Sequence, residues 1–259
     1  MPTTYDAMDI DWHRHPACGL CAIADGLTLA FVPVKAFLQR YLPALDGENR
    51  RRGRPLAITA DDFTRSLLAA SEIARVNTFK SLKRQTEWMA GRLAAKTLGQ
   101  LLAEDEPAIT DLRVAHDRQG APYLEHRPEL SLSISHAHDY AVAGLHQHTD
   151  TVIGLDLEKH QPLDIALMLR TAFSAREGRH LDPADRPRFF ACWTLKEAYL
   201  KYLGRGFRES LKQIEILGDT RIVDHGKPVA GLSVRVLQPF PQYTLAIVCG
   251  PRPSTLQVP

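Results

Sequence analysis

Two segments constrain this chain more than any other feature, one at residues 193–201 and one at residues 154–159. The first predicts a helix, on which Glu197 and Lys201 lie four residues apart and share a face. The second predicts a strand, on which Asp156 and Glu158 lie two residues apart on one face, separated by about 6.6 Å. Three carboxylates and an ammonium at these spacings are typical of a site where magnesium holds a diphosphate, because magnesium takes one or two carboxylates, several waters and phosphate oxygens. Phosphate chemistry is therefore the first functional hypothesis.

Each segment has an ordinary explanation when it is taken alone. A surface ion pair worth about 0.3–0.5 kcal/mol would account for Glu197 and Lys201. A strand with one solvated face would account for Asp156 and Glu158. The presence of both segments in one chain is what favours a functional site.

The composition of the chain is that of an ordinary globular protein. Its 259 residues allow one large domain or two small ones, and a net charge of +2 gives no reason to expect a nucleic-acid partner. No apolar run reaches the roughly 18–20 residues of a membrane helix, and residues 1–15 lack the layout of a signal peptide, so we expect a cytoplasmic protein without a membrane partner. Four cysteines do not make a disulfide framework in a chain of this length, so we expect reduced thiols.

Hydrophobic periodicity predicts an alternation of helices and strands along most of the chain, and residues 1–60 are the least readable part. The predicted helices span residues 61–103, with a break near Asn77, residues 165–171, a short helix after the capping box of Ser174 and Glu177, and residues 187–202, ending at Gly204 or Gly206. The predicted strands span residues 27–34, 130–135, 140–145, 151–157, 214–217, 232–237 and 243–248. The polar segment 46–55 and the Gly120-Ala121-Pro122 sequence are predicted to be a loop and a turn.

Basic residues accompany the apolar stripe of the helix at 82–102, namely Lys83, Arg84, Arg92 and Lys96. Most basic residues at such positions only solvate a helix. Further along the chain, a strand ends in Ser133-Ile134-Ser135-His136.

Five motifs, in order, resemble the signature of the Sfp-type 4′-phosphopantetheinyl transferases. They are the basic helix at 83–92, the Gly-x-Pro turn at 120–122, the Ser-His strand end at 133–136, the acidic strand at 154–159 and the helix at 193–201. Together they cover about residues 80–210, whereas no motif covers residues 1–60. The resemblance implies an α+β fold of two similar halves, each a small antiparallel sheet packed on a long helix. It places the N-terminal half at residues 1–150 and the C-terminal half at residues 151–259, with coenzyme A in the cleft between them.

The resemblance also implies an activity and a set of site residues. The enzyme would move the phosphopantetheine arm of coenzyme A onto a serine of an apo acyl or peptidyl carrier protein and release adenosine 3′,5′-bisphosphate. The metal ligands would be Asp156, Glu158 and Glu197, holding Mg²⁺ or Mn²⁺, and the catalytic residues would be Glu197 and Lys201. Coenzyme A would contact Arg84, Arg92, Gly120, Pro122, Ser135, His136, Lys196 and Lys201. We expect a monomer, again by resemblance.

The partner serine supplies the nucleophile, so the enzyme needs only a base, and Glu197 is the candidate, acting directly or through water. Some relatives carry a lysine before the Gly-x-Pro turn, where this chain has Gln119. One phosphate contact is therefore either missing or supplied elsewhere, with Lys159 and the Arg50–Arg52 run as candidates. Carrier domains are usually acidic, which makes Arg205, Phe207 and Arg208 candidate carrier contacts. The sequence does not say whether the carrier serves fatty-acid, polyketide or nonribosomal-peptide assembly, or whether the donor is free or acyl coenzyme A.

Two other functions stay open at this stage. The chain could bind coenzyme A or a carrier without transferring anything, although a pure binder has no need of Asp156, Glu158, Glu197 and Lys201 together. It could instead be a metal-dependent hydrolase of a nucleotide diphosphate, although no further group that would activate water is evident.

Other residues of metal-ligand type are weaker candidates. His13, His15, Cys18 and Cys21 lie close in sequence, but their spacing is unusual for a structural zinc site, and chance explains it better. Of the paired histidines, His136 is better explained as a phosphate contact, and we expect His138, His146 and His148 to be exposed. Cys192 and Cys249 are expected to be small buried apolar residues.

Overall fold

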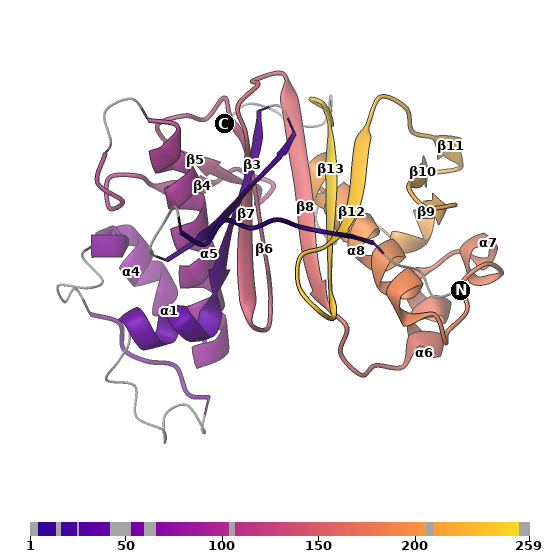
Figure 1. Ribbon diagram of the computed structural model, residues 1–259, viewed down its shortest axis with the longest axis horizontal. Coiled ribbons are helices and arrows are strands. Elements are labelled where there is room, and N and C mark those ends of the chain that lie inside the picture. The colour runs from indigo at the N-terminus through magenta and orange to yellow at the C-terminus, as the bar shows by residue number, and fades with distance from the viewer. Residues whose placement is uncertain are drawn as a thin grey trace. The chain divides into compact units, whose positions relative to one another are not determined.

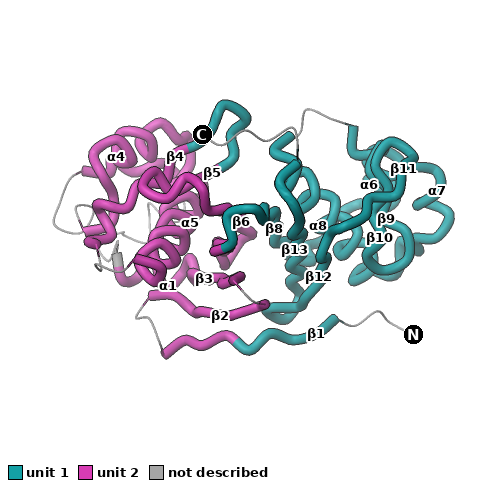
Figure 2. The backbone as a smooth tube through the Cα atoms, turned by 90° about the horizontal axis from the view of Figure 1, so that it is seen from above, with its two compact units in different colours: residues 1–9, 116–121, 148–259 teal, residues 10–115, 122–147 magenta. Residues whose placement is uncertain are grey.

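The computed structural model of the chain describes residues 5–13, 17–24, 26–41, 53–59, 66–103, 107–205 and 210–253. These residues form two compact units, which Figure 2 distinguishes by colour. Unit 1 comprises residues 1–9, 116–121 and 148–259, and unit 2 comprises residues 10–115 and 122–147. Each unit has its own hydrophobic core.

Unit 2 is a four-stranded antiparallel sheet covered by a long helix, α5 (Figure 1). The strand order is β2-β3-β7-β6, and α5 packs mainly on β7 and β3. A two-stranded pair, β4 and β5, precedes the last two strands of the sheet. The elements are β2 (Gly19–Ala24), β3 (Leu27–Pro33), α1 (Val34–Tyr41), α4 (Ala70–Val76), α5 (Leu82–Leu101), β4 (Val114–His116), β5 (Pro122–Leu124), β6 (Ser131–Ala137) and β7 (Tyr140–His146).

The start and the packing of α5 follow from its sequence. The side chain of Ser81 caps the helix by accepting a hydrogen bond from the backbone N–H of Arg84. At Gly91 the helix comes close to the sheet, since a Cβ atom placed there would lie 3.0 Å from Ile134 Cγ2 on β6. The same face of β6 carries His136 two residues further on, so α5 passes directly over that histidine.

Unit 1 is also a four-stranded sheet with a long helix, α8, packed on β8 and β13 (Figure 1). The strand order is β1-β12-β13-β8, in which β12, β13 and β8 pair antiparallel and the short β1 adds to β12 in parallel. A smaller three-stranded sheet has the order β11-β10-β9. The elements are β1 (Asp6–Ala7), β8 (Thr151–Lys159), α6 (Ile165–Ala172), α7 (Ala175–Gly178), α8 (Arg186–Leu203), the 3₁₀ helix η2 (Leu211–Gln213), β9 (Ile214–Leu217), β10 (Arg221–Asp224), β11 (Lys227–Pro228), β12 (Ser233–Gln238) and β13 (Tyr243–Pro251).

Local signals in the sequence set both ends of α8. The side chain of Asp185 caps the start by accepting from the N–H of Arg188, and Pro187 stands in the first turn, where its missing N–H costs nothing. Gly204 ends the helix in the left-handed conformation, with φ 66°, which glycine adopts without a steric penalty. Most residues of α8 are buried, because the sheet and the smaller elements of unit 1 cover it on several sides.

The two units repeat one topology, which confirms the prediction of an α+β fold with two similar halves. The order β3-β7-β6 in unit 2 corresponds to β8-β13-β12 in unit 1, and in both units the long helix lies between the first and second of these strands along the chain. The units differ at their edges, where β2 extends one sheet and β1 the other. The antiparallel sheet expected for each half is thus extended in unit 1 by a parallel strand. The division of the chain at residue 150 stays a prediction.

A buried ion pair in unit 2 ties α5 to the short helix before it. Lys96 Nζ lies 2.5 Å from Glu72 Oε2 and donates a second hydrogen bond, 2.7 Å long, to the carbonyl of Leu67. Glu72 Oε2 also accepts from the backbone N–H of Ala69, 3.0 Å away, at the start of α4. The lysine is fully buried, so its charge is compensated within the protein.

The same pattern recurs in unit 1, although its lysine and glutamate are 19 positions apart rather than 24. Lys196 Nζ lies 2.7 Å from Glu177 Oε2 and 3.2 Å from the carbonyl of Ala172, and Glu177 Oε2 accepts from the N–H of Ser174 at 2.9 Å. In each unit the glutamate follows its N-cap residue by three positions and the bonded carbonyl by five. The repeat therefore extends from strand order to individual hydrogen bonds.

Several predicted boundaries are confirmed. The break near Asn77 is the end of α4, the capping box of Ser174 and Glu177 begins α7, and Gly204 rather than Gly206 closes α8. The Arg50–Arg52 run, Gly206, Phe207 and Arg208 lie outside the described residues. Strands β1, β2, β10 and β11 were not predicted.

Candidate active site

The acidic residues of the candidate site lie where β8 packs against α8. They are Asp156 and Glu158 on β8 and Glu197 on α8. Gly154 makes this close approach possible, because a Cβ atom there would collide with the carbonyl oxygen of Ala198. Two residues further along the same face of β8, the carboxylate of Asp156 reaches the helix, and Lys201 Nζ lies 2.7 Å from Asp156 Oδ1. Asp156 is buried, with 6% of its surface exposed, whereas the Lys201 side chain is 32% exposed. The structure therefore brings together two predicted site residues that are 45 positions apart.

Glu158 contacts α8 about two turns nearer the start of the helix. Its Oε1 accepts a hydrogen bond from Trp193 Nε1 at 3.0 Å. Trp193 lies one turn before Glu197 on α8, and the sequence did not indicate this bond. An indole N–H is a donor only, so Trp193 fixes one oxygen of Glu158 without competing for a cation.

Burial, and after it repulsion among the acids, raises the pKa of two carboxyl groups in the site. Burial, together with the negative charges of Asp156 and Glu158, raises the pKa of Glu197 to about 7. Burial and the charge of Asp156 likewise raise the pKa of Glu158 to about 7, although the bond from Trp193 and the charge of Lys201 oppose the shift. Three carboxylates with one lysine thus carry an excess of negative charge in a partly desolvated place.

The chemistry of these groups fits a hard divalent cation. Carboxylate oxygens are the donors that magnesium prefers, and Glu197 Oε1 is buried without a hydrogen-bond partner among the described residues. Within the described part of the chain, no three His, Cys, Asp or Glu side chains are arranged as a ready-made metal cluster. One or two of the acids, completed by water and substrate phosphate, would satisfy magnesium without such a closed cluster.

A second cluster forms in unit 2 between α5 and β6. Arg84 Nη1 lies 2.7 Å from His136 Nε2, and the other ring nitrogen, Nδ1, lies 3.6 Å from Glu87 Oε2. Arg84 is exposed, and its guanidinium also lies over the ring of Phe79, 5.6 Å from the centroid. The predicted pair of Arg84 and His136 is therefore brought together, and Glu87 is a member that the sequence did not indicate.

Arg92 and Lys196, both expected to contact coenzyme A, are buried in separate units. Arg92 is 3% exposed and lies over the ring of Trp88, 4.5 Å from its centroid, with its Nε 3.8 Å from Glu72 Oε1. Burial lowers the pKa of Arg92 to about 10. Lys196 has no exposed surface, and its ammonium contacts Glu177 and two carbonyls, which favours a structural role. The predicted ligand contacts of both residues stay untested.

The remaining predicted cofactor residues lie in a turn and in a strand. Gly120 has φ 93°, a conformation that favours glycine, and nothing lies within 4 Å of the position its Cβ would take. Asp117 holds this turn by accepting from the N–H groups of Gln119 and Ala121, and Pro122 begins β5. Ser135, on β6, is 6% exposed.

Of the competing predictions, the cluster of His13, His15, Cys18 and Cys21 is only partly described, whereas the expectations for three histidines have clear outcomes. Cys18 is buried with its Sγ 3.3 Å from Thr97 Oγ1, while His15 lies outside the described residues. His138 and His148 are exposed as expected, but the expectation for His146 was wrong. His146 is 6% exposed because β7 is an inner strand, with β3 on one side and β6 on the other.

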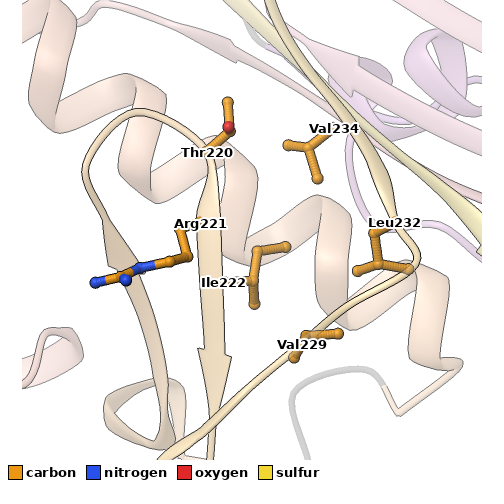
Figure 3. Close-up of a pocket in the computed structure, with 6 residues that line it drawn as sticks. All are labelled: Thr220, Arg221, Ile222, Val229, Leu232 and Val234. Atoms are coloured by element: carbon orange, nitrogen blue, oxygen red, sulfur yellow. The ribbon is translucent and has the colours of Figure 1, made fainter.

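A surface pocket of about 240 Å³ in unit 1 is unrelated to the acidic residues (Figure 3). Its lining is mostly aliphatic, and the guanidinium of Arg221 points away from Leu232 and Val234 in Figure 3. The lining residues are Thr220, Arg221, Ile222, Val229, Leu232 and Val234.

None of the helices that the structure describes combines the length and the apolar character that crossing a membrane requires.

Family models match both parts of the chain. The model of the 4′-phosphopantetheinyl transferase N-terminal domain matches residues 75–146, which include Arg84, Glu87 and His136. The model of the 4′-phosphopantetheinyl transferase superfamily matches residues 152–238, which include the acids and Lys201.

Curated relatives agree with the family models. The chain is 30% identical over 148 residues to the 4′-phosphopantetheinyl transferase psf-1 of Bacillus pumilus, covering 53% of this chain and 60% of the relative. It is 32% identical over 158 residues to the 4′-phosphopantetheinyl transferase HetI of Nostoc sp., covering 58% and 64%. It is 33% identical over 96 residues to a holo-[acyl-carrier-protein] synthase of Lactococcus lactis, covering 32% of this chain and 76% of that protein.

The match thus spans less than two thirds of the first two of these relatives. It does span three quarters of the shorter synthase, and the two family models follow one another along the chain in the order that the sequence motifs predicted. The chain therefore belongs to the 4′-phosphopantetheinyl transferase superfamily and is of the Sfp type.

Proposed function

We propose that this chain transfers the 4′-phosphopantetheine arm of coenzyme A to a serine hydroxyl of an apo acyl or peptidyl carrier protein. The serine oxygen forms a bond to the phosphorus that bears the pantetheine arm, and the bridging P–O bond of the diphosphate breaks. The electron pair leaves with adenosine 3′,5′-bisphosphate, and the hydroxyl proton passes to a base on the enzyme. The observation that carries the proposal is the meeting of Asp156, Glu158 and Lys201 across β8 and α8, beside Glu197.

The residues of unit 1 have three proposed roles at the diphosphate, which are charge neutralisation, proton transfer and metal binding. Lys201, the more exposed partner of its pair with Asp156, turns to the diphosphate and offsets the charge that develops on the leaving oxygen. Glu197, whose Oε1 has no hydrogen-bond partner among the described residues, takes the proton of the serine hydroxyl, directly or through a water. Asp156, Glu158 and Glu197 would hold Mg²⁺ or Mn²⁺, which supplies Lewis-acid neutralisation of the phosphate oxygens when bound.

In unit 2, Arg84 and His136 are assigned to the 3′-phosphate of coenzyme A. A guanidinium forms two parallel hydrogen bonds with a phosphate, and the α5 N-terminus adds the positive end of a helix dipole near Arg84. Gly120, Pro122 and Ser135 are assigned to backbone contacts with the same ligand, while Arg92 is assigned to support of α5 through Glu72 and Trp88.

The carrier protein is the macromolecular partner in this proposal. Arg205 is the described residue among its candidate contacts, and it now faces Asp224, with Nη1 3.9 Å from Oδ2. An acidic carrier would compete with Asp224 for this guanidinium. Charge reversal at Arg205 should raise KM for the carrier and leave KM for coenzyme A unchanged, and an unchanged carrier KM would remove Arg205 from the contact surface.

The test is to incubate the protein with coenzyme A, magnesium and a panel of apo carriers, and then to measure the mass of each carrier. A gain of one phosphopantetheine arm, lost in Asp156→Asn, supports the proposal. Consumption of coenzyme A without that gain indicates hydrolysis of the diphosphate, and no change in either component indicates a binding protein. Both of these outcomes overturn the proposal.

A further inference from the structure

His136 lies between a positive and a negative side chain that both come from the first turns of α5. Its Nε2 is 2.7 Å from Arg84 Nη1, and its Nδ1 is 3.6 Å from Glu87 Oε2. Arg84 and Glu87 are three residues apart on the helix, so they present to the same side. The ring nitrogens of His136 therefore lie near groups of opposite charge, Nε2 near Arg84 and Nδ1 near Glu87.

The spacing of residues along α5 and β6 explains why Glu87 lies beside His136. Gly91 of α5 lies against Ile134 of β6, so the two elements are in register at that point. One turn back along the helix, about 6 Å, brings Glu87 over the strand. Two residues along the strand, about 6.6 Å, bring His136 to the same level. The close contact at Gly91 thus fixes which helix residue meets the imidazole.

The charges around His136 determine which ring nitrogen carries the proton. An arginine N–H is always a donor, so Nε2 facing Arg84 must accept when the ring is neutral. The ring proton then resides on Nδ1, toward Glu87. When a phosphate is bound by Arg84, the carboxylate beside Nδ1 also favours the doubly protonated ring, whose Nε2–H donates to the phosphate oxygen.

The burial of Glu87 is unusual for an acid on a helix. Its side chain is 7% exposed, whereas Lys83, its partner in an i,i+4 ion pair at 3.7 Å, is 64% exposed. Burial raises the pKa of Glu87, while the charges of Lys83, Arg84 and His138 oppose that shift. An acid placed only to pair with Lys83 would remain at the surface, whereas this buried carboxylate lies 3.6 Å from the imidazole of His136.

We propose that Glu87 is a positioning residue, which fixes the Nδ1–H of His136 and so aims its Nε2 at a phosphomonoester held by Arg84. The inference rests on the proposed function, because that function assigns Arg84 and His136 to the 3′-phosphate of coenzyme A. Glu87 itself touches no ligand in this account and acts through the imidazole.

The test compares two probes that differ only in the 3′-phosphate, adenosine 3′,5′-bisphosphate and adenosine 5′-monophosphate, by calorimetric titration of the full chain. The wild type should prefer the bisphosphate, and Glu87→Gln should reduce that preference about tenfold, the lower end of the effect of removing a carboxylate behind a binding histidine. In a His136→Ala background the same substitution should have no further effect, since there is no imidazole left to position. Glu129→Gln, at a surface position, serves as the matched control and should retain the preference.

The outcomes separate this inference from the proposed function. If Glu87→Gln keeps the full preference, or lowers it equally with and without His136, the positioning role is wrong while the transfer activity stands. If the wild type itself shows no preference, the phosphate assignment of Arg84 and His136 fails and the inference with it. Should Glu87→Gln not unfold cooperatively, Glu87→Asp replaces it, because the shorter carboxylate is withdrawn from Nδ1; a reduced preference supports the inference and an unchanged one overturns it.

Discussion

Lys196 Nζ lies 2.7 Å from Glu177 Oε2, and neither side chain exposes any surface to solvent. The residue after Lys196 is Glu197, the proposed base, so this buried pair holds the part of α8 on which the chemistry depends. Glu177 also accepts from the backbone N–H of Ile216 on β9, at 2.9 Å. One glutamate thus joins α7, α8 and the smaller sheet of unit 1.

Replacing Lys196 by Met should destabilise the protein strongly. The substitution leaves Glu177 buried with its charge uncompensated, and losing one partner of a buried ion pair costs about 3–5 kcal/mol. The measurement is the free energy of unfolding from urea titration. As a matched control, Arg127→Met removes an exposed ion pair, with Arg127 Nε 2.5 Å from Glu129 Oε1, and should cost less than about 1 kcal/mol. Equal losses in the two variants would contradict the structural role of Lys196.

Gly154→Ala should disturb the packing of β8 on α8. The added Cβ would collide with the carbonyl of Ala198 and the backbone of Tyr202, neither of which yields easily, and overpacking of this kind costs about 1–3 kcal/mol. Thermal unfolding of Gly154→Ala against Gly178→Ala checks the prediction, because nothing lies within 4 Å of a Cβ at Gly178. Unfolding of Gly154→Ala at the wild-type temperature would contradict the close approach of β8 and α8 at this glycine.

The stability of Glu87→Gln relative to the wild type should increase as the pH rises. Burial raises the folded-state pKa of Glu87 above its unfolded value, so the folded protein binds this proton more tightly. Ionisation of Glu87 therefore weakens the wild type as pH rises through the interval between the two pKa values. Glutamine does not titrate, so the stability of Glu87→Gln relative to the wild type should increase from pH 4 to pH 7. Melting temperatures of both proteins across this range test it, and a relative stability that falls with pH would show that Glu87 is instead stabilised in its charged form.

Sequence patterns predicted the long elements because their signals are local. The proline and glycine that bound α8, the capping box at Ser174 and the alternation along β8 all act over a few residues. Strand β1 was not predicted, because a strand of two residues carries no periodic pattern. Its parallel pairing also joins Asp6 to Leu237, which are separated by almost the whole chain. Non-local pairing of this kind depends on the folded sheet rather than on propensity.

Site residues were predictable where the chemistry requires a particular residue type. They were less predictable where a residue's role depends on which side chains are buried beside it. Asp156, Glu158, Glu197 and Lys201 were identified from spacing, and the structure brings Lys201 onto Asp156. Lys96, by contrast, was read as a residue that solvates α5, yet it is fully buried, because a single sequence does not show that Glu72 lies opposite it. The role of Glu87 was missed for the same reason, since its partner His136 is on a strand 49 positions away.

Glu197→Gln should slow transfer to a carrier by about 10²–10⁴-fold in kcat at saturating magnesium and coenzyme A, the usual contribution of general acid–base catalysis. The amide preserves the shape of the side chain but does not take up a proton. Single-turnover measurement of holo-carrier formation isolates this step from product release. Turnover near the wild-type rate would exclude Glu197 as the base.

The most direct test of the account is the binding of Mn²⁺ to the acids of β8 and α8, followed by electron paramagnetic resonance in the presence of coenzyme A. The account predicts one bound ion per chain in the wild type, with an affinity at least about tenfold weaker in Asp156→Asn and in Glu158→Gln, while Glu129→Gln binds as the wild type does. Undiminished binding of Mn²⁺ in both acid variants would show that the cation lies elsewhere and would contradict the proposed site.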